Sequence, residues 1–179
     1  IKIREFCDEN NLYLIEDAAC AHGSSYLDVN TGNFGHAACI SFHHSKVLTS
    51  GEGGIVTTES DEIAEKVRRI RAIGLDRSIN NWESFNVGSN AKMSEITATL
   101  AILHTRKAPE IIKERQTIAD KYNALINFNK DFVQFNLPEG TSSCYYKYFI
   151  RTSDNFSIPD FSKFMSENGI ELPPTTYSY

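Results

Sequence analysis

The chain has 179 residues, of which 41% are hydrophobic and 23% charged, which is typical of a soluble globular domain or of one domain with part of another. Its 18 Lys and Arg against 23 Asp and Glu give a formal charge of −5, which argues against a nucleic-acid groove or a polybasic membrane patch. No apolar run approaches the ~20 residues that a membrane-spanning helix requires. Frequent Leu, Ile, Val and Phe argue against disorder.

The four cysteines form no CxxC pair and have no zinc-site spacing; they are Cys7, Cys20, Cys39 and Cys144. Cys39 lies in an apolar run, so we expect it to be a buried free thiol. A disulfide framework is not expected for this size and composition. The cysteine pattern therefore predicts a reducing, cytoplasmic compartment.

Both ends of the sequence differ from those of a complete protein. Position 1 is Ile, and Ile1, Ile3 and Phe6 have helical spacing, as if the chain begins inside a helix. Residues 173–179 end in irregular sequence, and the charged start does not fit a signal peptide. We expect a fragment of a longer chain; the alternative is a natural small protein with processed ends.

Three short runs of apolar or β-branched residues predict strands at residues 12–15, 37–42 and 54–58. The first two have the composition of strands that are buried on both faces of a parallel sheet.

A helix is predicted to follow the third strand. Ser60 is a favourable N-cap, and acidic residues occupy the next two positions. One helical face carries Ile63, Val67 and Ile70. Gly74 suits the position just after the helix ends.

Residues 75–91 are polar and predict a long loop, a length that is usually functional or disordered. A helix is predicted over 94–105, and another with Pro109 in its first turn. The side chains expected to face inward from the first are Ile96, Leu100 and Leu103. The apolar face of the second carries Ile111, Ile118, Tyr122 and Leu125.

A polar stretch at 127–130 predicts a domain boundary. Beyond it, residues 132–135 and 145–150 predict strands, and a short helix with Phe161, Phe164 and Met165 ends near Gly169. This order predicts an α/β fold with a mostly parallel sheet covered by helices. We expect two parts, residues 1–126 and a smaller α/β piece at 127–179.

Asp17, Ser41 and Lys46 lie at strand ends, where open α/β sheets bind ligands. Lys46 leaves a buried strand for a Gly-rich turn, so desolvation could lower its pKa and let its amine form a Schiff base with an aldehyde. The Asp17 carboxylate could hold a protonated pyridine nitrogen, as pyridoxal phosphate requires. Two plainer interpretations stay open: Asp17 as a turn or N-cap residue, and Lys46 as a solvated side chain.

His22, His43 and His44 raise the possibility of a metal site. We expect none, because His43 and His44 are sequence neighbours and no acidic or thiolate partner has suitable spacing. His22 is expected to be a hydrogen-bonded turn residue.

Ordered motifs run from about residue 10 to 126: residues 16–23 (EDAACAHG), 32–35 (GNFG), 41–46 (SFHHSK), 51–54 (GEGG), 88–95 (GSNAKMSE) and the 115–122 helix. Together they resemble the DegT/StrS family of pyridoxal-phosphate-dependent nucleotide-sugar aminotransferases, which have the aspartate aminotransferase fold. The resemblance implies that residues 1–126 are the C-terminal part of the cofactor-binding large domain with connecting helices, and that 127–179 begin the small domain.

The resemblance also implies roles for single residues. Lys46 would bind the cofactor aldehyde and later carry the proton; Asp17 would pair with the pyridine nitrogen, and Ser41 would donate to the phosphate. Asn90 would reach the phosphate in the partner subunit of a homodimer. Cys20 stands where the family usually has Gln and is expected near the cofactor, although a thiol is a weaker donor.

The function implied is amino transfer, with glutamate as the expected donor, to a keto-sugar linked to a nucleotide, for surface polysaccharide or a glycosylated metabolite. The family's glycine-containing phosphate loop and ring-stacking aromatic would precede Ile1, so this chain alone need not be active. Two alternatives remain. One is a related sugar dehydratase, which Lys46 disfavours because that branch has His there. The other is a non-catalytic, regulatory or truncated relative.

Overall fold

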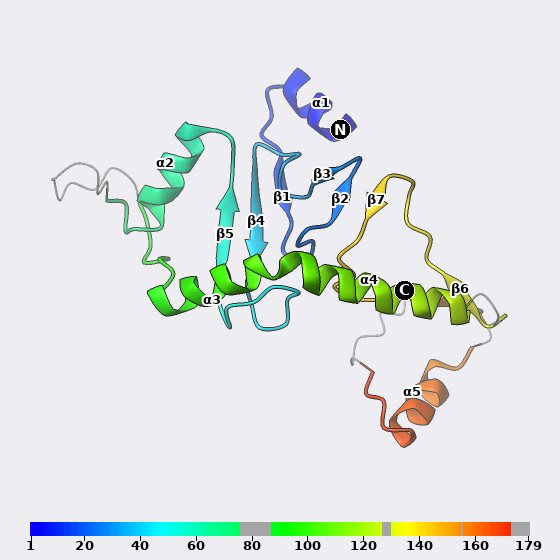
Figure 1. The fold of residues 1–179 in the computed structure, drawn as a ribbon. Helices are drawn as coiled ribbons and strands as arrows, with labels where there is room; N and C mark the ends of the chain where they lie inside the picture. The colour runs from blue at the N-terminus through cyan, green and yellow to red at the C-terminus, as the bar shows by residue number, and fades with distance from the viewer. Residues whose placement is uncertain (76–86, 127–129, 155, 173–179) are drawn as a thin grey trace. The chain divides into compact units, whose positions relative to one another are not determined.

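The computed structural model describes residues 1–75, 87–126, 130–154 and 156–172 (Figure 1). Contacts divide the chain into two compact units. The first consists of Ile1–Lys121 with Asn136–Tyr148, and the second of Tyr122–Phe135 with Phe149–Tyr179. Every candidate site residue belongs to the first unit. The expectations for residues 76–86, 127–129, 155 and 173–179 lie outside the described residues.

The main sheet of the first unit has the strand order β1 (Ile15–Asp17), β4 (Ala37–Ser41), β5 (Gly54–Thr57). β1 and β4 are parallel, whereas β4 and β5 run in opposite directions, as Figure 1 shows. The prediction of an α/β fold is confirmed, but the third strand is antiparallel. The reason is the connection: residues 42–53 contain no helix, and a parallel return needs a crossover of about a dozen or more residues, usually helical.

Helices flank this sheet. They are α1 (Lys2–Glu9), α2 (Asp61–Ile70), α3 (Glu95–Arg106) and α4 (Ala108–Ile126). The predicted N-cap of α2 is confirmed, because the Ser60 hydroxyl accepts a hydrogen bond from the Ile63 N–H. Gly74 closes the turn after α2 with a left-handed φ of 80° and donates its N–H to Arg69 O.

A small antiparallel sheet that the sequence analysis missed joins distant parts of the first unit. Its order is β3 (Val29–Asn30), β2 (Ser25–Tyr26), β7 (Thr141–Ser142). Strands of two residues are too short for an alternation pattern to reveal. β7 brings residues 136–148 against the segment that follows β1.

The buried core of the first unit lies beneath the loop that carries Lys46. It contains Phe42, Val47, Leu48, Ala101 and Cys144. Met93, Ile111, Ile112 and Tyr146 pack against it. The loop is therefore fixed by its own buried apolar residues: Phe42 precedes its polar residues, and Val47 and Leu48 follow Lys46.

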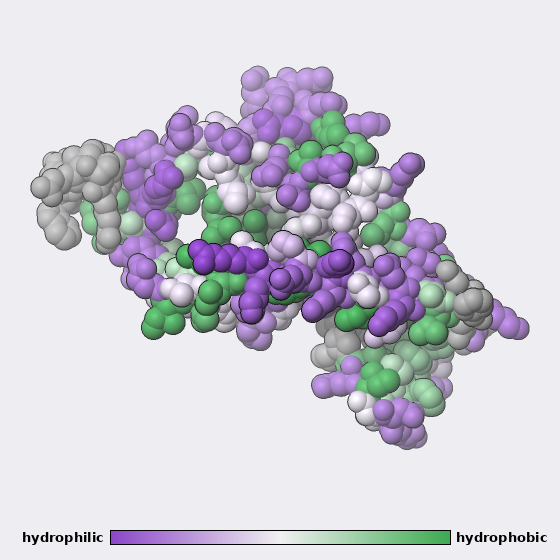
Figure 2. All heavy atoms as spheres, in the orientation of Figure 1, coloured by the Kyte–Doolittle hydropathy of each residue, from purple (hydrophilic) through white to green (hydrophobic). Residues whose placement is uncertain are grey.

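Several apolar residues that we expected to be buried are exposed. On α3, Ile96, Leu100 and Leu103 are 76%, 44% and 48% exposed, and the small Ala101 is the buried residue instead. On α4, Ile118, Tyr122 and Leu125 are likewise exposed. Figure 2 shows green, hydrophobic spheres along the lower left of the surface, where α3 lies in Figure 1. Helical periodicity identified an apolar face, but not what covers it.

Two further expectations of burial are wrong. The first strand spans Ile15–Asp17 rather than 12–15, and Leu12 and Tyr13 before it are 50% and 72% exposed. Cys39 is exposed, because its side chain lines a pocket beside α2 instead of a packed sheet face.

The second unit contains β6 (Phe132–Gln134), β8 (Ile150–Thr152) and α5 (Ile158–Glu167). β6 and β8 pair antiparallel, and three phenylalanine rings pack at centroid distances of 5.0 to 5.6 Å: Phe132, Phe156 and Phe161.

The predicted strand at 145–150 is wrong except for Ile150. Tyr145 has a left-handed φ of 46° and donates its N–H to the Ser143 hydroxyl, so the backbone turns there. None of the helices in the described part of the chain is long and apolar enough to span a bilayer.

Candidate active site

Parallel pairing brings the carboxyl ends of β1 and β4 to one edge of the main sheet. Asp17 ends β1 opposite Cys39, so Ser41, two residues further along β4, extends the same edge. The Asp17 carboxylate accepts the Ala19 N–H at 3.1 Å, which is the turn role that the sequence left open. The Ser41 hydroxyl accepts the His43 N–H at 3.3 Å. Both polar groups therefore lie where a ligand would meet the sheet.

The loop between β4 and β5 presents Lys46. Phe42 ties both ends of the loop together, since its N–H donates to Gly53 O at 2.8 Å and its carbonyl accepts from Ser50 N at 3.0 Å. Lys46 N donates to His43 O at 3.0 Å, and the next two residues, Val47 and Leu48, are buried. These contacts hold the Lys46 backbone while its side chain extends away from the core.

The Lys46 amine meets a thiol and an aromatic ring. Lys46 Nζ lies 2.9 Å from Cys20 Sγ and 5.0 Å from the centre of the Tyr146 ring. Asp17 is near enough for its negative charge to act on the same amine. The structure thus brings together Asp17, Cys20 and Lys46, three of the residues singled out from the sequence.

The electrostatics of Lys46 differ from the expectation. Its hydrogen bond with Cys20 raises the pKa of Lys46 above its ordinary value, and the charges of Cys20, Tyr146 and Asp17 act in the same direction. Desolvation, which we expected to lower the pKa of Lys46, does act in that direction and is the second-largest influence, but the hydrogen bond with Cys20 outweighs it. The prediction of a lysine activated by burial is therefore wrong for this structure.

Tyr146 is a site residue that sequence reasoning missed. It comes from the 136–148 segment, which is held against the turn after β1. Cys144 N donates to Ser24 Oγ at 3.0 Å, and Cys144 Sγ contacts Cys20 O at 3.5 Å. The only sequence signal was the aromatic run at 145–149, which we interpreted as a strand.

His22 is buried without the hydrogen bonds we expected. It is 5% exposed, and neither ring nitrogen has a hydrogen-bond partner among the residues that the structure describes. Its ring packs beside Phe42 at a centroid distance of 5.8 Å. Burial lowers the pKa of His22, and the nearby positive charge of Lys46 lowers it further. The backbone of Ser41 raises the pKa in part, although it does not form a hydrogen bond of good geometry with the ring. His22 is thus a neutral imidazole beside Lys46, with unused hydrogen-bonding capacity.

Asn90 lies apart from this group, on the connection between α2 and α3. It forms an isolated antiparallel bridge with Ala72, and its side chain is exposed. The structure of one chain therefore places Asn90 at the surface and does not test a contact across an interface.

His43 and His44 have an acidic neighbour that the sequence spacing did not reveal. His43 Nε2 lies 3.6 Å from Glu52 Oε1, and the two imidazole rings are 3.9 Å apart. One possible ligand atom from each of the three residues lies within 4.8 Å of the others. The argument that no acidic group accompanies these histidines is therefore wrong. The three residues belong to the loop that carries Lys46; His44 and Glu52 are exposed and His43 is half-buried.

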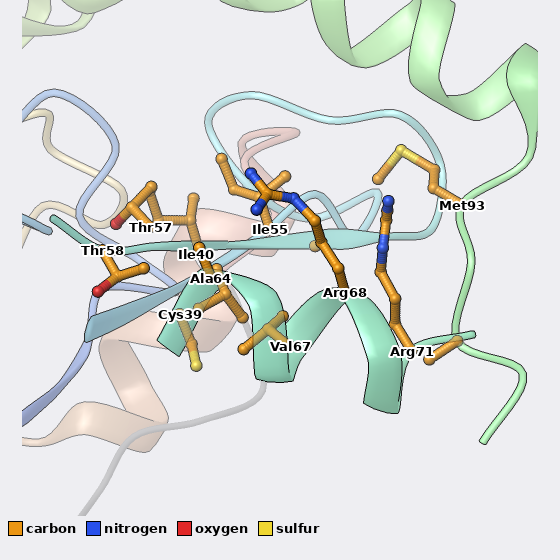
Figure 3. A pocket seen from close by; sticks show the side chains of 13 residues that line it. Cys39, Ile40, Ile55, Thr57, Thr58, Ala64, Val67, Arg68, Arg71 and Met93 are labelled. Carbon is orange, nitrogen blue, oxygen red and sulfur yellow. The ribbon is translucent and has the colours of Figure 1, made fainter. Parts of the chain in front are cut away.

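A cavity of about 720 Å³ lies elsewhere in the first unit, between the β4–β5 face and α2. Figure 3 shows apolar side chains such as Ile55 and Val67 around it, together with Arg68 from α2 and Arg71, which follows that helix. None of Asp17, Cys20, Ser41 and Lys46 lines this cavity. It is therefore distinct from the group around Lys46.

Residues 1–177 match the model of the DegT/DnrJ/EryC1/StrS aminotransferase family. The chain is 33% identical over 189 residues to a dTDP-4-dehydro-2,3,6-trideoxy-D-glucose 4-aminotransferase from Saccharopolyspora spinosa, covering 99% of this chain and 48% of that protein. It is 30% identical over 177 residues to a GDP-perosamine synthase from Vibrio cholerae, covering 98% and 48%. The chain spans about half the length of the curated relatives it matches.

The fold is also found in solved structures. The aminotransferase TlmJ from Streptoalloteichus hindustanus superposes with a TM-score of 0.86 at 27% identity, covering 99% of this chain and 47% of that one.

Proposed function

The chain belongs to the DegT/DnrJ/EryC1/StrS aminotransferase family, and from that premise we propose that its protein transfers an amino group to a nucleotide-linked keto-sugar with pyridoxal phosphate as cofactor. The observation that carries the proposal is the joint placement of the Lys46 amine and the Asp17 carboxylate at one sheet edge. The relatives named for amination of dTDP- and GDP-linked sugars support this substrate class. Glutamate is the proposed donor.

The residues present fit this cofactor. When bound, pyridoxal phosphate supplies an aldehyde that takes up an amine and a ring that withdraws electrons from the reacting carbon. Lys46 offers the amine, Asp17 a carboxylate for the ring nitrogen, and Ser41 a hydroxyl for the phosphate. The buried His22 nitrogens without partners are a further sign that this edge is built for a polar group outside the described chain.

Each residue has a distinct task in the proposed reaction. Lys46 would hold the cofactor through its amine and would act as general base and acid toward the substrate. The Asp17 carboxylate would pair with the ring nitrogen. Ser41 would donate its hydroxyl to the phosphate.

We propose that the working unit is a homodimer in the cytoplasm, with Asn90 directed to the partner's phosphate site. The exposed apolar side chains of α3 and α4 support an interface, because contiguous apolar surface of this kind is uncommon on a monomer. The exposed position of Asn90 is compatible with a contact to a second copy.

Turnover tests the proposal. The protein as the cell makes it is incubated with pyridoxal phosphate, glutamate and a set of dTDP-, GDP- and UDP-linked keto-sugars, and amino-sugar products are measured by mass spectrometry. We expect product with at least one of these keto-sugars and none with Lys46→Ala. The matched control is Lys113→Ala, an exposed lysine on α4. Undiminished turnover in Lys46→Ala would refute the assignment of Lys46.

A further inference from the structure

Cys20 makes a close polar contact that amino transfer itself does not require. Its sulfur lies 2.9 Å from Lys46 Nζ. A thiol is a weak donor that can also exchange a proton with the amine it contacts.

Both partners of the contact are held by independent supports. On one side, the Cys20 carbonyl accepts from the buried Cys144 thiol at 3.5 Å, and Ala21 N closes a turn on Ala18 O at 3.1 Å. On the other side, Lys46 is followed by buried Val47 and Leu48. The fold therefore fixes the two backbone segments from which the sulfur and the nitrogen meet.

The surroundings of the pair favour a protonated amine. From β1 comes the Asp17 carboxylate, from the turn after it Cys20, and from the 136–148 segment the Tyr146 ring. The nearby His22 is neutral, and a second cation, Lys147, lies 5.8 Å from the Tyr146 ring centre. A protonated amine cannot attack a carbonyl carbon, so whatever stabilises this form delays carbonyl capture.

We propose that Cys20 is a positioning residue for Lys46, which holds the lysine as a thiol-bound ammonium and thereby controls how readily its amine captures a carbonyl compound. This inference rests on the proposed function in that Lys46 is the group the cofactor must reach. It assigns to Cys20 a role beyond contact with the cofactor ring. Loss of the sulfur frees the amine, so capture then begins at lower pH.

The first experiment tests the proximity of the pair in solution. o-Phthalaldehyde condenses with one primary amine and one thiol, with loss of two waters, to a fluorescent isoindole in which nitrogen bonds both former carbonyl carbons and sulfur bonds one. The purified full-length protein, freed of cofactor, should give a Cys20–Lys46 isoindole, located by peptide mass spectrometry. Cys20→Ala and Lys46→Ala should lose it. Cys39→Ala, which removes the other exposed thiol, should retain it.

The second experiment measures how strongly Cys20 affects the reactivity of the Lys46 amine at each pH. The rate at which Lys46 is trapped by pyridoxal and borohydride is followed against pH, with the modified peptide quantified. The thiol contact raises the pKa of Lys46, so removing it lowers the pKa and increases the neutral fraction at a fixed pH. Cys20→Ala should therefore shift the midpoint to lower pH. Cys20→Ser should shift it less, because a hydroxyl keeps part of the hydrogen bond, and Cys39→Ala should not shift it.

The outcomes are separable from those of the proposed function. Neither measurement needs phosphate-bearing cofactor, sugar substrate or turnover, so both succeed even if the protein transfers no amino group. A wild-type protein without the Cys20–Lys46 isoindole, or one whose trapping profile matches that of folded Cys20→Ala and Cys20→Ser variants, overturns the role of Cys20. Circular dichroism of each variant establishes that it is folded.

Discussion

Glu16 shows how a single side chain can shape the loop beside the site. Its carboxylate accepts the backbone N–H groups of Gly32, Phe34 and Gly35 at 2.8, 2.7 and 2.6 Å. Hydrogen bonds to an ionised acceptor are stronger than neutral ones, and their donors would otherwise be left unpaired. The strand residue just before Asp17 thus fixes the 32–35 loop to β1.

We therefore expect Glu16→Gln to reduce the free energy of unfolding by about 1–3 kcal/mol. The reason is that a neutral amide accepts more weakly and brings donors of its own toward three N–H groups. Urea denaturation of the variant and of Glu59→Gln, an exposed glutamate outside any helix or strand, measures the difference. Equal midpoints for the two variants would remove Glu16 from this structural role.

Asp17 carries the second prediction at this scale. Asp17→Asn cannot hold a protonated ring nitrogen, so cofactor should still bind while amino transfer slows by about 100-fold or more. Bound cofactor is measured by absorbance and transfer by single-turnover kinetics. Asp28→Asn, an exposed carboxylate in the β2–β3 turn, is the control. Unchanged transfer in Asp17→Asn would show that this carboxylate has no such task.

At the scale of single residues, the sequence predicted the positions that depend only on neighbouring residues in the chain. Asp17 and Ser41 end strands and Lys46 follows one, so their common edge could be inferred from the pattern alone. Tyr146 could not be, because it lies a hundred residues from Lys46 and long-range contacts, the β2–β7 pairing and those of Cys144 with Ser24 and Cys20, bring it there. The pKa of Lys46 was also beyond reach, since its direction depends on contacts rather than on the loop sequence.

Among the elements, α2 offers the clearest test of a local signal. The Ser60 hydroxyl satisfies one N–H of its first turn, and replacing such a cap by Ala costs about 1 kcal/mol. Ser60→Ala should therefore lower the unfolding free energy by this amount and reduce protection of the α2 amides in hydrogen exchange. Ser166→Ala, in the exposed last turn of α5, should change it little. An equal effect of both variants would contradict the capping role.

The predicted and observed helices and strands agree in some features and differ in others. β4, β5 and the start of α2 were predicted within a residue or two because each has a strong period and a clear end signal, whereas α2 ends at Ile70, before the position that Gly74 indicated. The direction of β5 was missed although the lack of a helical stretch in 42–53 already indicated an antiparallel return. The inward face predicted for α3 was wrong, and of the apolar face predicted for α4 only Ile111 packs against the core, because periodicity finds the apolar face but not the partner that covers it.

At the scale of the whole molecule, the proposed homodimer can be tested at the exposed apolar residues of α3. If α3 contributes to a dimer interface, Ile96→Glu with Leu100→Glu places two charges in it and should shift the protein from dimer toward monomer. Light scattering coupled to gel filtration measures the mass. Lys113→Glu, a charge change at an exposed position of α4, should leave the dimer intact. A wild-type monomer, or a dimer that survives both substitutions, would exclude this interface.

The most direct test of the central claim is the location of the bound cofactor. The full-length protein is loaded with pyridoxal phosphate and reduced with borohydride, which makes a bond between cofactor and lysine permanent, and its peptides are then identified by mass spectrometry. We predict that the label lies on Lys46 and disappears in Lys46→Ala. Label on another lysine, or none on a folded protein saturated with cofactor, would contradict the account.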